Sequence, residues 1–145
     1  MTASSSAVRS GTTTTSQTAT PPQHAWVGIV DDDASLRRAL ARALRGSGIR
    51  AQAFGSAEEF LDRRVRHMPN CIVLDIHLGG LSGFDLRDRL MAAGGAPPII
   101  FITGHDDVFA KRARESGACG FLRKPFDMSD LLALLEPHLR PSTSR

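Results

Sequence analysis

Cys71-Ile72-Val73-Leu74-Asp75 is the stretch of this 145-residue chain that decides its fold. Four apolar residues in a row that end in a single acid are typical of a short strand buried on both faces of a sheet. Residues 26–30 and 99–102 repeat the pattern, and each run is again followed by a polar residue. Two further strands, with weaker signals, are expected at residues 51–54 and 121–122.

Segments with a helical spacing of apolar residues separate these strands. Ser56 with Glu59 three residues later is a capping box, which predicts the start of one such helix. Asp106 or Asp107 is expected to cap another, which would run to about residue 116. The remaining helices are expected over residues 36–44, 84–91 and 129–139.

Strands that alternate with helices predict an α/β domain, in which a parallel sheet carries helices on both faces. We expect a flavodoxin-like, doubly wound (βα)5 sandwich of three layers with the strand order 2-1-3-4-5. Half of residues 1–24 are Ser or Thr, so a disordered tail is expected there. The domain is expected to cover residues 25–140, followed by a flexible tail at 141–145 and no output domain.

Charge and composition argue against several classes of function. The net charge is only +3 and the arginines are scattered, which gives no electrostatic case for nucleic acid or an anionic membrane. No stretch approaches the roughly 18–20 apolar residues of a membrane span. The two cysteines, Cys71 and Cys119, cannot form the disulfide framework of a small secreted domain. We therefore expect a cytoplasmic protein with reduced thiols that binds neither nucleic acid nor a membrane.

Polar residues follow the ends of four of the expected strands. Asp31 and Asp32 follow the first strand and Asp75 the third, while Thr103 follows the fourth and Lys124 the fifth. The carboxyl ends of parallel strands lie at one edge of a sheet, and ligands of such folds bind there. We therefore expect these side chains to lie close together.

The carboxylates at this edge would repel one another, by on the order of 4 kcal/mol for each close pair at an effective dielectric of ~20. They must either bind protons or be neutralised by a cation. Oxygen ligands favour a hard ion, and Mg²⁺ suits the site because it keeps waters and bridges to phosphate. Lys124 and Thr103 would then contact phosphate oxygens, and an aspartate nucleophile would form an aspartyl phosphate.

The chain resembles the response-regulator receiver domain of two-component signalling, in its FixJ-like form. The resemblance covers about residues 26–137. Each motif alone is a weak signal, but five of them in the right order at the ends of strands are a strong one. The matching segments are residues 27–33 (VGIVDDD), 71–76 (CIVLDI), 81–86 (LSGFDL), 99–105 (IIFITGH) and 120–126 (GFLRKPF).

The resemblance implies a role for each acidic residue of the site. Asp75 would accept a phosphoryl group from a histidine kinase or a phosphotransfer protein. Asp31, Asp32, Asp75 and the backbone carbonyl of His77 would hold Mg²⁺, with Asp31 acting largely through water. The domain would be a switch and not an enzyme, beyond catalysing its own phosphorylation and dephosphorylation.

The resemblance also implies how phosphorylation is transmitted. The Thr103 hydroxyl would turn toward the phosphoryl group, Lys124 would pair with that group, and Phe121 lies where the family has a switch aromatic. The Lys124–Pro125 peptide is cis in the family. An unidentified downstream protein would then read the surface of the last two helices and the strand between them.

Two departures from the family pattern concern the loops. Gly79 stands where a proline is expected, which predicts a looser loop after Asp75. The interval from Thr103 to Lys124 is about one residue shorter than usual, and the helix between them or its lead-in loop is expected to absorb the difference.

Three other interpretations remain open. A haloacid-dehalogenase-type phosphatase also uses an aspartate nucleophile after a strand, but His77 stands where that family has a second aspartate. A flavodoxin-like cofactor binder would place a flavin phosphate beside residues 31–33, which would repel it. The third is a docking module on the same fold that is never phosphorylated. His77 and His105 are expected to be solvated loop residues.

Overall fold

The structure is a computed structural model, which describes residues 25–63, 67–104 and 107–140. Its strands are β1 (Val27–Val30), β2 (Ala51–Phe54), β3 (Cys71–Asp75), β4 (Ile99–Thr103) and β5 (Gly120–Arg123). Its helices are α2 (Ala34–Gly46), α3 (Ala57–Asp62), α4 (Gly83–Ala92), α5 (Ala110–Glu115) and α6 (Met128–Leu139), with a 3₁₀ turn, η1 (Asp107–Phe109), before α5. All strand pairs are parallel, and the order across the sheet is β2-β1-β3-β4-β5.

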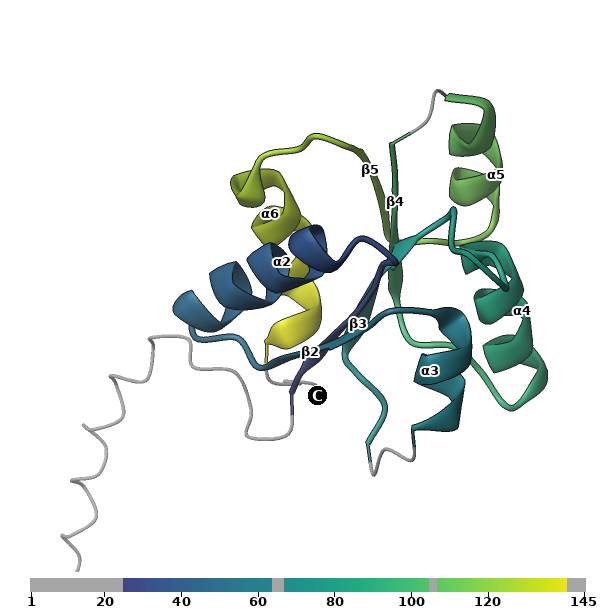
Figure 1. Cartoon of the computed structure of the whole chain (residues 1–145), viewed down its shortest axis with the longest axis horizontal. Helices are drawn as coiled ribbons and strands as arrows, with labels where there is room; N and C mark the ends of the chain where they lie inside the picture. The colour runs from purple at the N-terminus through teal and green to yellow at the C-terminus, as the bar shows by residue number, and fades with distance from the viewer. Residues whose placement is uncertain (1–24, 64–66, 105–106, 141–145) are drawn as a thin grey trace, which may run out of the picture.

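Helices cover both faces of the sheet, with α2 and α6 on one face and α3, α4 and α5 on the other (Figure 1). Every residue of β1, β3 and β4 is buried, because both faces of these central strands are covered. Alternate residues point to opposite faces: Val73 packs in the core beneath α2 and α6, whereas Leu74 packs in the core beneath α3 and α4. The sandwich therefore has three layers and two cores.

Short-range polar contacts start two of the helices. The Asp33 side chain accepts hydrogen bonds from the backbone N–H groups of Ser35 and Leu36, and it thereby caps α2. At α4, Ser82 and Asp85 form a reciprocal capping box, in which each side chain accepts from the other's backbone N–H. The first helix, α2, begins four residues after the end of β1, and α4 begins eight residues after the end of β3.

Two details of the expected helix starts are wrong. Ser56 does cap α3 by accepting from Glu59 N–H, but the Glu59 side chain accepts from Gly55 N–H instead of closing the box on Ser56. The helix after β4 begins at Ala110, later than expected, because η1 precedes it. Phe109 occupies its N-cap and makes no side-chain capping hydrogen bond, and Asp106 lies outside the described residues.

The expected fold class, sheet order and alternation of elements are confirmed. The Lys124–Pro125 peptide is cis, as the family resemblance implied. The expectations for residues 1–24 and 141–145 fall outside the described residues. No helix in the described ranges is long and apolar enough to cross a membrane.

Candidate functional site

Three buried polar residues lie at the carboxyl edge of the sheet. Asp31 directly follows β1, Asp75 ends β3 and Thr103 ends β4, with exposed fractions of 0%, 4% and 0%. In the described part of the chain these are the polar or charged residues that are buried. Lys124 follows β5, and its backbone N–H donates to the Thr103 carbonyl at 2.8 Å. The sheet therefore concentrates its buried polar groups where ligands bind in folds of this kind.

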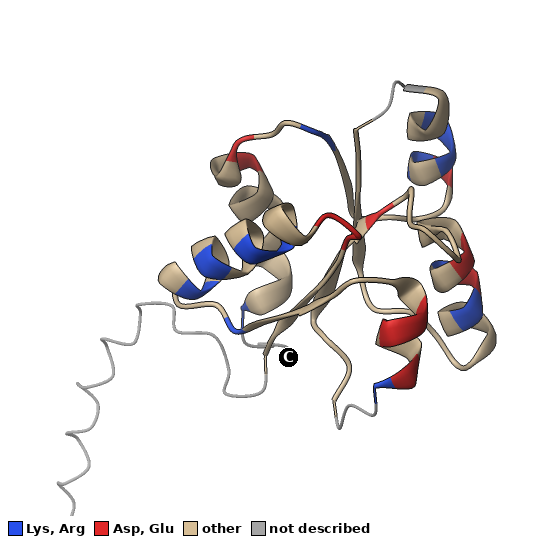
Figure 2. Ribbon diagram, viewed as in Figure 1, with Lys and Arg blue, Asp and Glu red and all other residues tan. Residues whose placement is uncertain are grey.

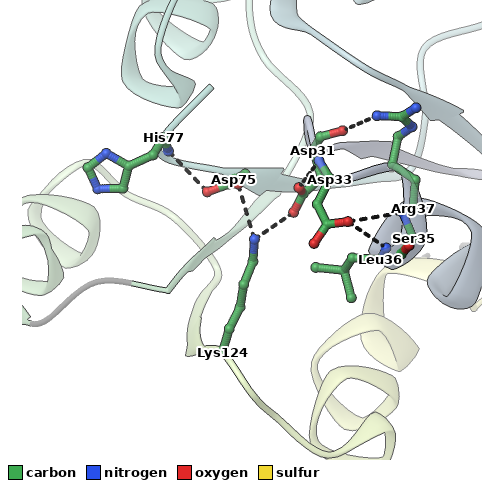
Figure 3. Close-up of polar contacts among 8 residues, drawn as sticks. All are labelled: Asp31, Asp33, Ser35, Leu36, Arg37, Asp75, His77 and Lys124. Atoms are coloured by element: carbon green, nitrogen blue, oxygen red, sulfur yellow. Dashed lines mark hydrogen bonds and ion pairs between the residues drawn. The ribbon is translucent and has the colours of Figure 1, made fainter. Parts of the chain in front are cut away.

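Lys124 bridges the two buried carboxylates, as Figure 3 shows. Its Nζ lies 2.9 Å from Asp31 Oδ2 and donates to Asp75 Oδ2 at 3.1 Å. The lysine side chain is 23% exposed, so it reaches the site from the solvent side while the carboxylates stay covered. One ammonium thus neutralises part of the charge of two aspartates.

Backbone groups hold the same carboxylates from the other side. His77 N–H donates to Asp75 Oδ1 at 3.0 Å, and Asp33 N–H donates to Asp31 Oδ1 at 2.8 Å. Arg37 Nη1 donates to the Asp31 backbone carbonyl at 2.8 Å. Because each carboxylate is fixed through both oxygens or through its backbone, the site is organised before any ligand binds.

The carboxylates of Asp31, Asp32 and Asp75 form a cluster that could hold a metal ion, with one oxygen of each within 4.8 Å of the others. Asp32 is exposed and gives access from solvent. Asp31 Oδ2 is shielded from solvent and, although Lys124 lies near it, forms no hydrogen bond of good geometry with a described residue. A cluster of oxygen donors with one such unsatisfied carboxylate oxygen fits a hard cation.

The electrostatics of the site favour a bound proton or cation at Asp75. Burial raises the pKa of Asp75 above its ordinary value of 3.8, and the neighbouring Asp31 carboxylate raises it further, against the opposing effects of His77 N–H and Lys124. For Lys124, burial lowers the pKa, but the two carboxylates outweigh that effect and the net shift is upward. The lysine therefore stays charged, while an ionised Asp75 destabilises the folded domain.

We predict that Asp75→Asn makes the domain more stable at neutral pH in the absence of divalent cations, raising the melting temperature by several degrees. A carboxyl whose pKa is raised on folding contributes stability that is present below its unfolded value and lost as the pH rises through its folded value. Asparagine cannot ionise, so it avoids this loss. Thermal unfolding in EDTA at pH 8 and pH 5 checks this. The difference in melting temperature between Asp75→Asn and the wild type should be smaller at pH 5. A variant less stable than wild type at pH 8 would contradict it.

The other proposed site residues differ in burial and in their packing partners. Thr103 is fully buried at the end of β4, and Phe121 lies half-buried in β5 against the core beneath α3, α4 and α5. The His77 ring was expected to be solvated, which is wrong: it is half-buried and packs edge-on against Phe109, with 4.8 Å between ring centroids. His105 lies outside the described residues. The roles assigned to these residues stay predictions, as do those of Asp31, Asp32, Asp75 and Lys124.

Three contributors to the site were not foreseen from the sequence: Arg37, Glu58 and Gly83. Arg37 holds Asp31 through its carbonyl, as described above. Glu58 lies in α3, and its Oε2 accepts from Leu81 N–H at 3.0 Å, which ties α3 to the loop after β3. Gly83 packs directly against the Asp75 backbone. No sequence pattern predicts the contacts of Arg37 or Glu58. Gly83, by contrast, lies inside the matched motif at residues 81–86.

We predict that Glu58→Gln weakens divalent-cation binding about threefold to tenfold without unfolding the domain. The carboxylate of Glu58 accepts a charge-assisted hydrogen bond from Leu81, and a neutral amide holds the loop less strongly. The effect on binding is expected to be larger than in a domain with proline at position 79, because Gly79 has no side chain that restricts the loop. Titration of Mg²⁺ followed by NMR or calorimetry checks this, with Glu136→Gln, an exposed glutamate in α6, as the control. Equal affinity in Glu58→Gln and wild type would contradict it.

Comparisons with known proteins bear on this geometry. The family model described as the response regulator receiver domain matches residues 27–136. Nodulation protein W of Bradyrhizobium diazoefficiens is 45% identical over 109 residues, which are 74% of this chain and 48% of that protein. The transcriptional regulatory protein FixJ of Azorhizobium caulinodans is 38% identical over 125 residues, 86% of this chain and 59% of that protein. The chain thus spans about half the length of these relatives.

Solved structures agree with this result. A response regulator receiver protein from Burkholderia phymatum superposes with a TM-score of 0.66 at 42% identity, covering 77% of this chain and 94% of that one. The chemotaxis protein CheY4 of Vibrio cholerae gives a TM-score of 0.69 at 26% identity, covering 79% and 98%. With the family model matching well over half of the chain, the protein belongs to the response regulator receiver domain family of two-component systems.

Proposed function

We propose that this domain accepts a phosphoryl group on Asp75 from a histidine kinase or phosphotransfer protein, and that its phosphorylation is read through protein–protein contact. The observation that carries the proposal is the setting of the Asp75 carboxylate. It is almost buried, fixed by Lys124 and His77 N–H, and within 4.8 Å of the Asp31 and Asp32 carboxylates. A positioned carboxylate beside a cation site and a lysine is what an aspartyl-phosphate reaction needs.

In the proposed reaction, one carboxylate oxygen of Asp75 attacks the phosphorus of a phosphohistidine. The phosphorus–nitrogen bond breaks, and its electron pair stays on the imidazole of the donor. Lys124, already paired with Asp75 Oδ2, neutralises charge on the incoming phosphoryl oxygens. Mg²⁺ would supply further positive charge to these oxygens. Asp31, Asp32, Asp75 and the His77 carbonyl would hold it.

The readout is proposed to involve α5, β5 and α6. Thr103 is buried at the end of β4, next to the strand that carries Phe121, and the backbone of Lys124 joins Thr103 to the residues after β5. Movement of the Thr103 hydroxyl toward a phosphoryl group would change the space available to Phe121. The proposed setting is the cytoplasm.

Incubation with Mg²⁺ and a small acyl phosphate, followed by intact mass measurement, tests the proposal. We expect one phosphate adduct on the wild type, none on Asp75→Asn, and none on the wild type in EDTA. Asp88→Asn, which removes an exposed carboxylate on α4, is the matched control and should be modified like the wild type.

Three results would overturn the proposal. No adduct on the wild type, under conditions that modify another receiver domain, would favour a docking module that is never phosphorylated. Continuous turnover of a generic phosphate ester that depends on Asp75 would favour a phosphatase, despite the histidine at position 77. An adduct that persists in Asp75→Asn would move the site elsewhere.

A further inference from the structure

A hollow of about 500 Å³ lies between α2 and the edge strand β2, and Arg37 is the residue that it shares with the acidic site. Four arginines line it, together with one alanine from the helix and one from the strand: Arg37, Arg38, Ala41, Arg42, Arg45 and Ala53. The two alanines leave room where larger side chains would fill the space. The volume lies within the range of small-molecule sites in proteins.

The charge of α2 sets this helix apart from the others. It carries four arginines and no acidic residue, and Figure 2 shows only basic residues coloured along it. Each other helix in the described ranges carries at least one acid. Arg38 and Arg42 are four residues apart on α2, a spacing at which like charges destabilise a helix. The arrangement is therefore costly for the helix alone, and an anion in the hollow would relieve that cost.

Two of the arginines are held in place by the backbone. Arg37 Nη1 donates to the Asp31 carbonyl and Arg45 Nη2 to the Ala51 carbonyl, each at 2.8 Å. These two bonds fix one guanidinium toward each end of α2. Each bond uses one nitrogen, so the other N–H groups of each guanidinium can donate to a ligand. A ligand that contacts fixed donors loses less conformational entropy on binding than one that must order them.

The other two arginines are open to a ligand. Arg38 and Arg42 are exposed, and neither makes a hydrogen bond or ion pair with a described residue. Guanidinium groups bind phosphate oxygens through two parallel charge-assisted hydrogen bonds, which are stronger than neutral hydrogen bonds and fix the orientation of the phosphate. Two fixed and two adjustable guanidiniums around an apolar floor suit a compact ligand with several phosphate oxygens.

We propose that this hollow binds a small molecule that carries two or three linked phosphate groups, such as a free oligophosphate or the phosphate end of a nucleotide. Four guanidiniums within one helix neutralise the charge of such a group, and the alanine floor accepts its uncharged part. A nucleic-acid duplex is a poorer fit, because a duplex needs cations spread along a surface and this set is confined to one hollow.

Calorimetric titration of the full chain with inorganic tripolyphosphate tests the proposal, in EDTA and at constant ionic strength. EDTA keeps the acidic site from contributing through a metal, so failure here is distinct from failure of the phosphorylation proposal. We expect saturable binding to one site in the wild type and at least tenfold weaker binding in Arg38→Gln/Arg42→Gln. The matched control is Arg87→Gln/Arg89→Gln on α4, which removes the same charge and should bind within twofold of wild type.

A further titration, with ATP, identifies the source of the phosphate groups. ATP that binds more tightly than tripolyphosphate supports a nucleotide, and ATP that binds equally or less tightly supports the oligophosphate group alone. No saturable heat, or equal weakening in both double variants, would overturn the proposal. So would a short DNA duplex that binds at least tenfold more tightly than tripolyphosphate through Arg38 and Arg42.

Discussion

Lys124→Met is expected to lower the free energy of unfolding by about 2–3 kcal/mol at pH 7.5 without divalent cations, and to slow phosphorylation from an acyl phosphate by about 100-fold. Removing one partner of a fully buried ion pair costs ~3–5 kcal/mol, because the other charge is left uncompensated. Here the lysine keeps 23% of its side chain exposed, so the smaller loss is expected. The rate effect follows from the loss of a fixed charge beside the transferred group.

The stability loss should depend on pH in a defined direction. Asp75 already has a raised pKa, and Lys124 is one of the groups that hold it down. Without the lysine the pKa of Asp75 rises further, so the carboxyl becomes neutral at a higher pH. A neutral carboxyl needs no cation. The penalty of Lys124→Met should therefore shrink as the pH falls toward 5. Lys124→Met/Asp75→Asn should regain only part of the loss at pH 7.5, because the buried Asp31 still lacks its partner.

Chemical unfolding in urea checks the stability, and intact mass over time checks the rate. Lys111→Met is the control, because Lys111 pairs with Glu115 at 2.9 Å on the surface, where both side chains are more than half exposed. Such pairs contribute about 0–1 kcal/mol. If Lys124→Met is no more destabilising than Lys111→Met, the lysine does not neutralise the buried carboxylates as the distances indicate.

The sequence was sufficient for the parts of this molecule that rest on local pattern. The apolar runs at β1, β3 and β4 are continuous because these strands are buried on both faces, and that pattern predicts a parallel sheet. The parallel sheet in turn puts Asp31 and Asp75 at one edge. Local contacts also start α2, where the Asp33 side chain accepts from two N–H groups of the helix.

Contacts between segments that are distant in the sequence could not be predicted from its local patterns. Glu58 and Leu81 are 23 residues apart, and no pattern links a glutamate on an exposed helix turn to a backbone N–H in a loop. The arginines are scattered along the sequence, yet the helical spacing of α2 and the position of β2 gather four of them around one hollow. The expected start of α5 was wrong for a local reason: Asp107, one of the two expected caps, begins the turn η1, and α5 begins only at Ala110.

The tight junction between β3 and α4 leads to the last prediction: Gly83→Ala is expected to destabilise the domain by about 1–2 kcal/mol and to reduce phosphorylation at Asp75. Gly83 is the first residue of α4, and its N–H donates to the Ile76 carbonyl at 2.9 Å. A Cβ at this position would lie 2.5 Å from the Asp75 carbonyl oxygen and 3.1 Å from Ile76 Cα. Both are backbone atoms, so neither can move away as a flexible side chain would.

Two opposing effects decide the sign of this substitution. Alanine in place of glycine favours a helix by up to ~1 kcal/mol, and it also reduces the entropy of the unfolded chain. Overpacking against fixed atoms costs ~1–3 kcal/mol. The steric effect is expected to win, because relief requires a shift of the Asp75 backbone, which is tied to β4 through the hydrogen bond from Ile76 N–H to the Ile102 carbonyl at 3.0 Å.

Gly79→Ala separates this steric effect from the general effect of replacing a loop glycine. A Cβ on Gly79 would have no atom within 4 Å, and Gly79 is not among the glycines with positive φ, so alanine is tolerated there. Gly79→Ala should match or slightly exceed wild type in urea unfolding and be phosphorylated at the same rate. Gly83→Ala should be less stable and slower, because the shift that accommodates its Cβ displaces the carboxylate from Lys124. A Gly83→Ala protein as stable as Gly79→Ala would mean that the junction yields without moving Asp75, and the close packing behind the phosphoacceptor would then have no role in positioning it.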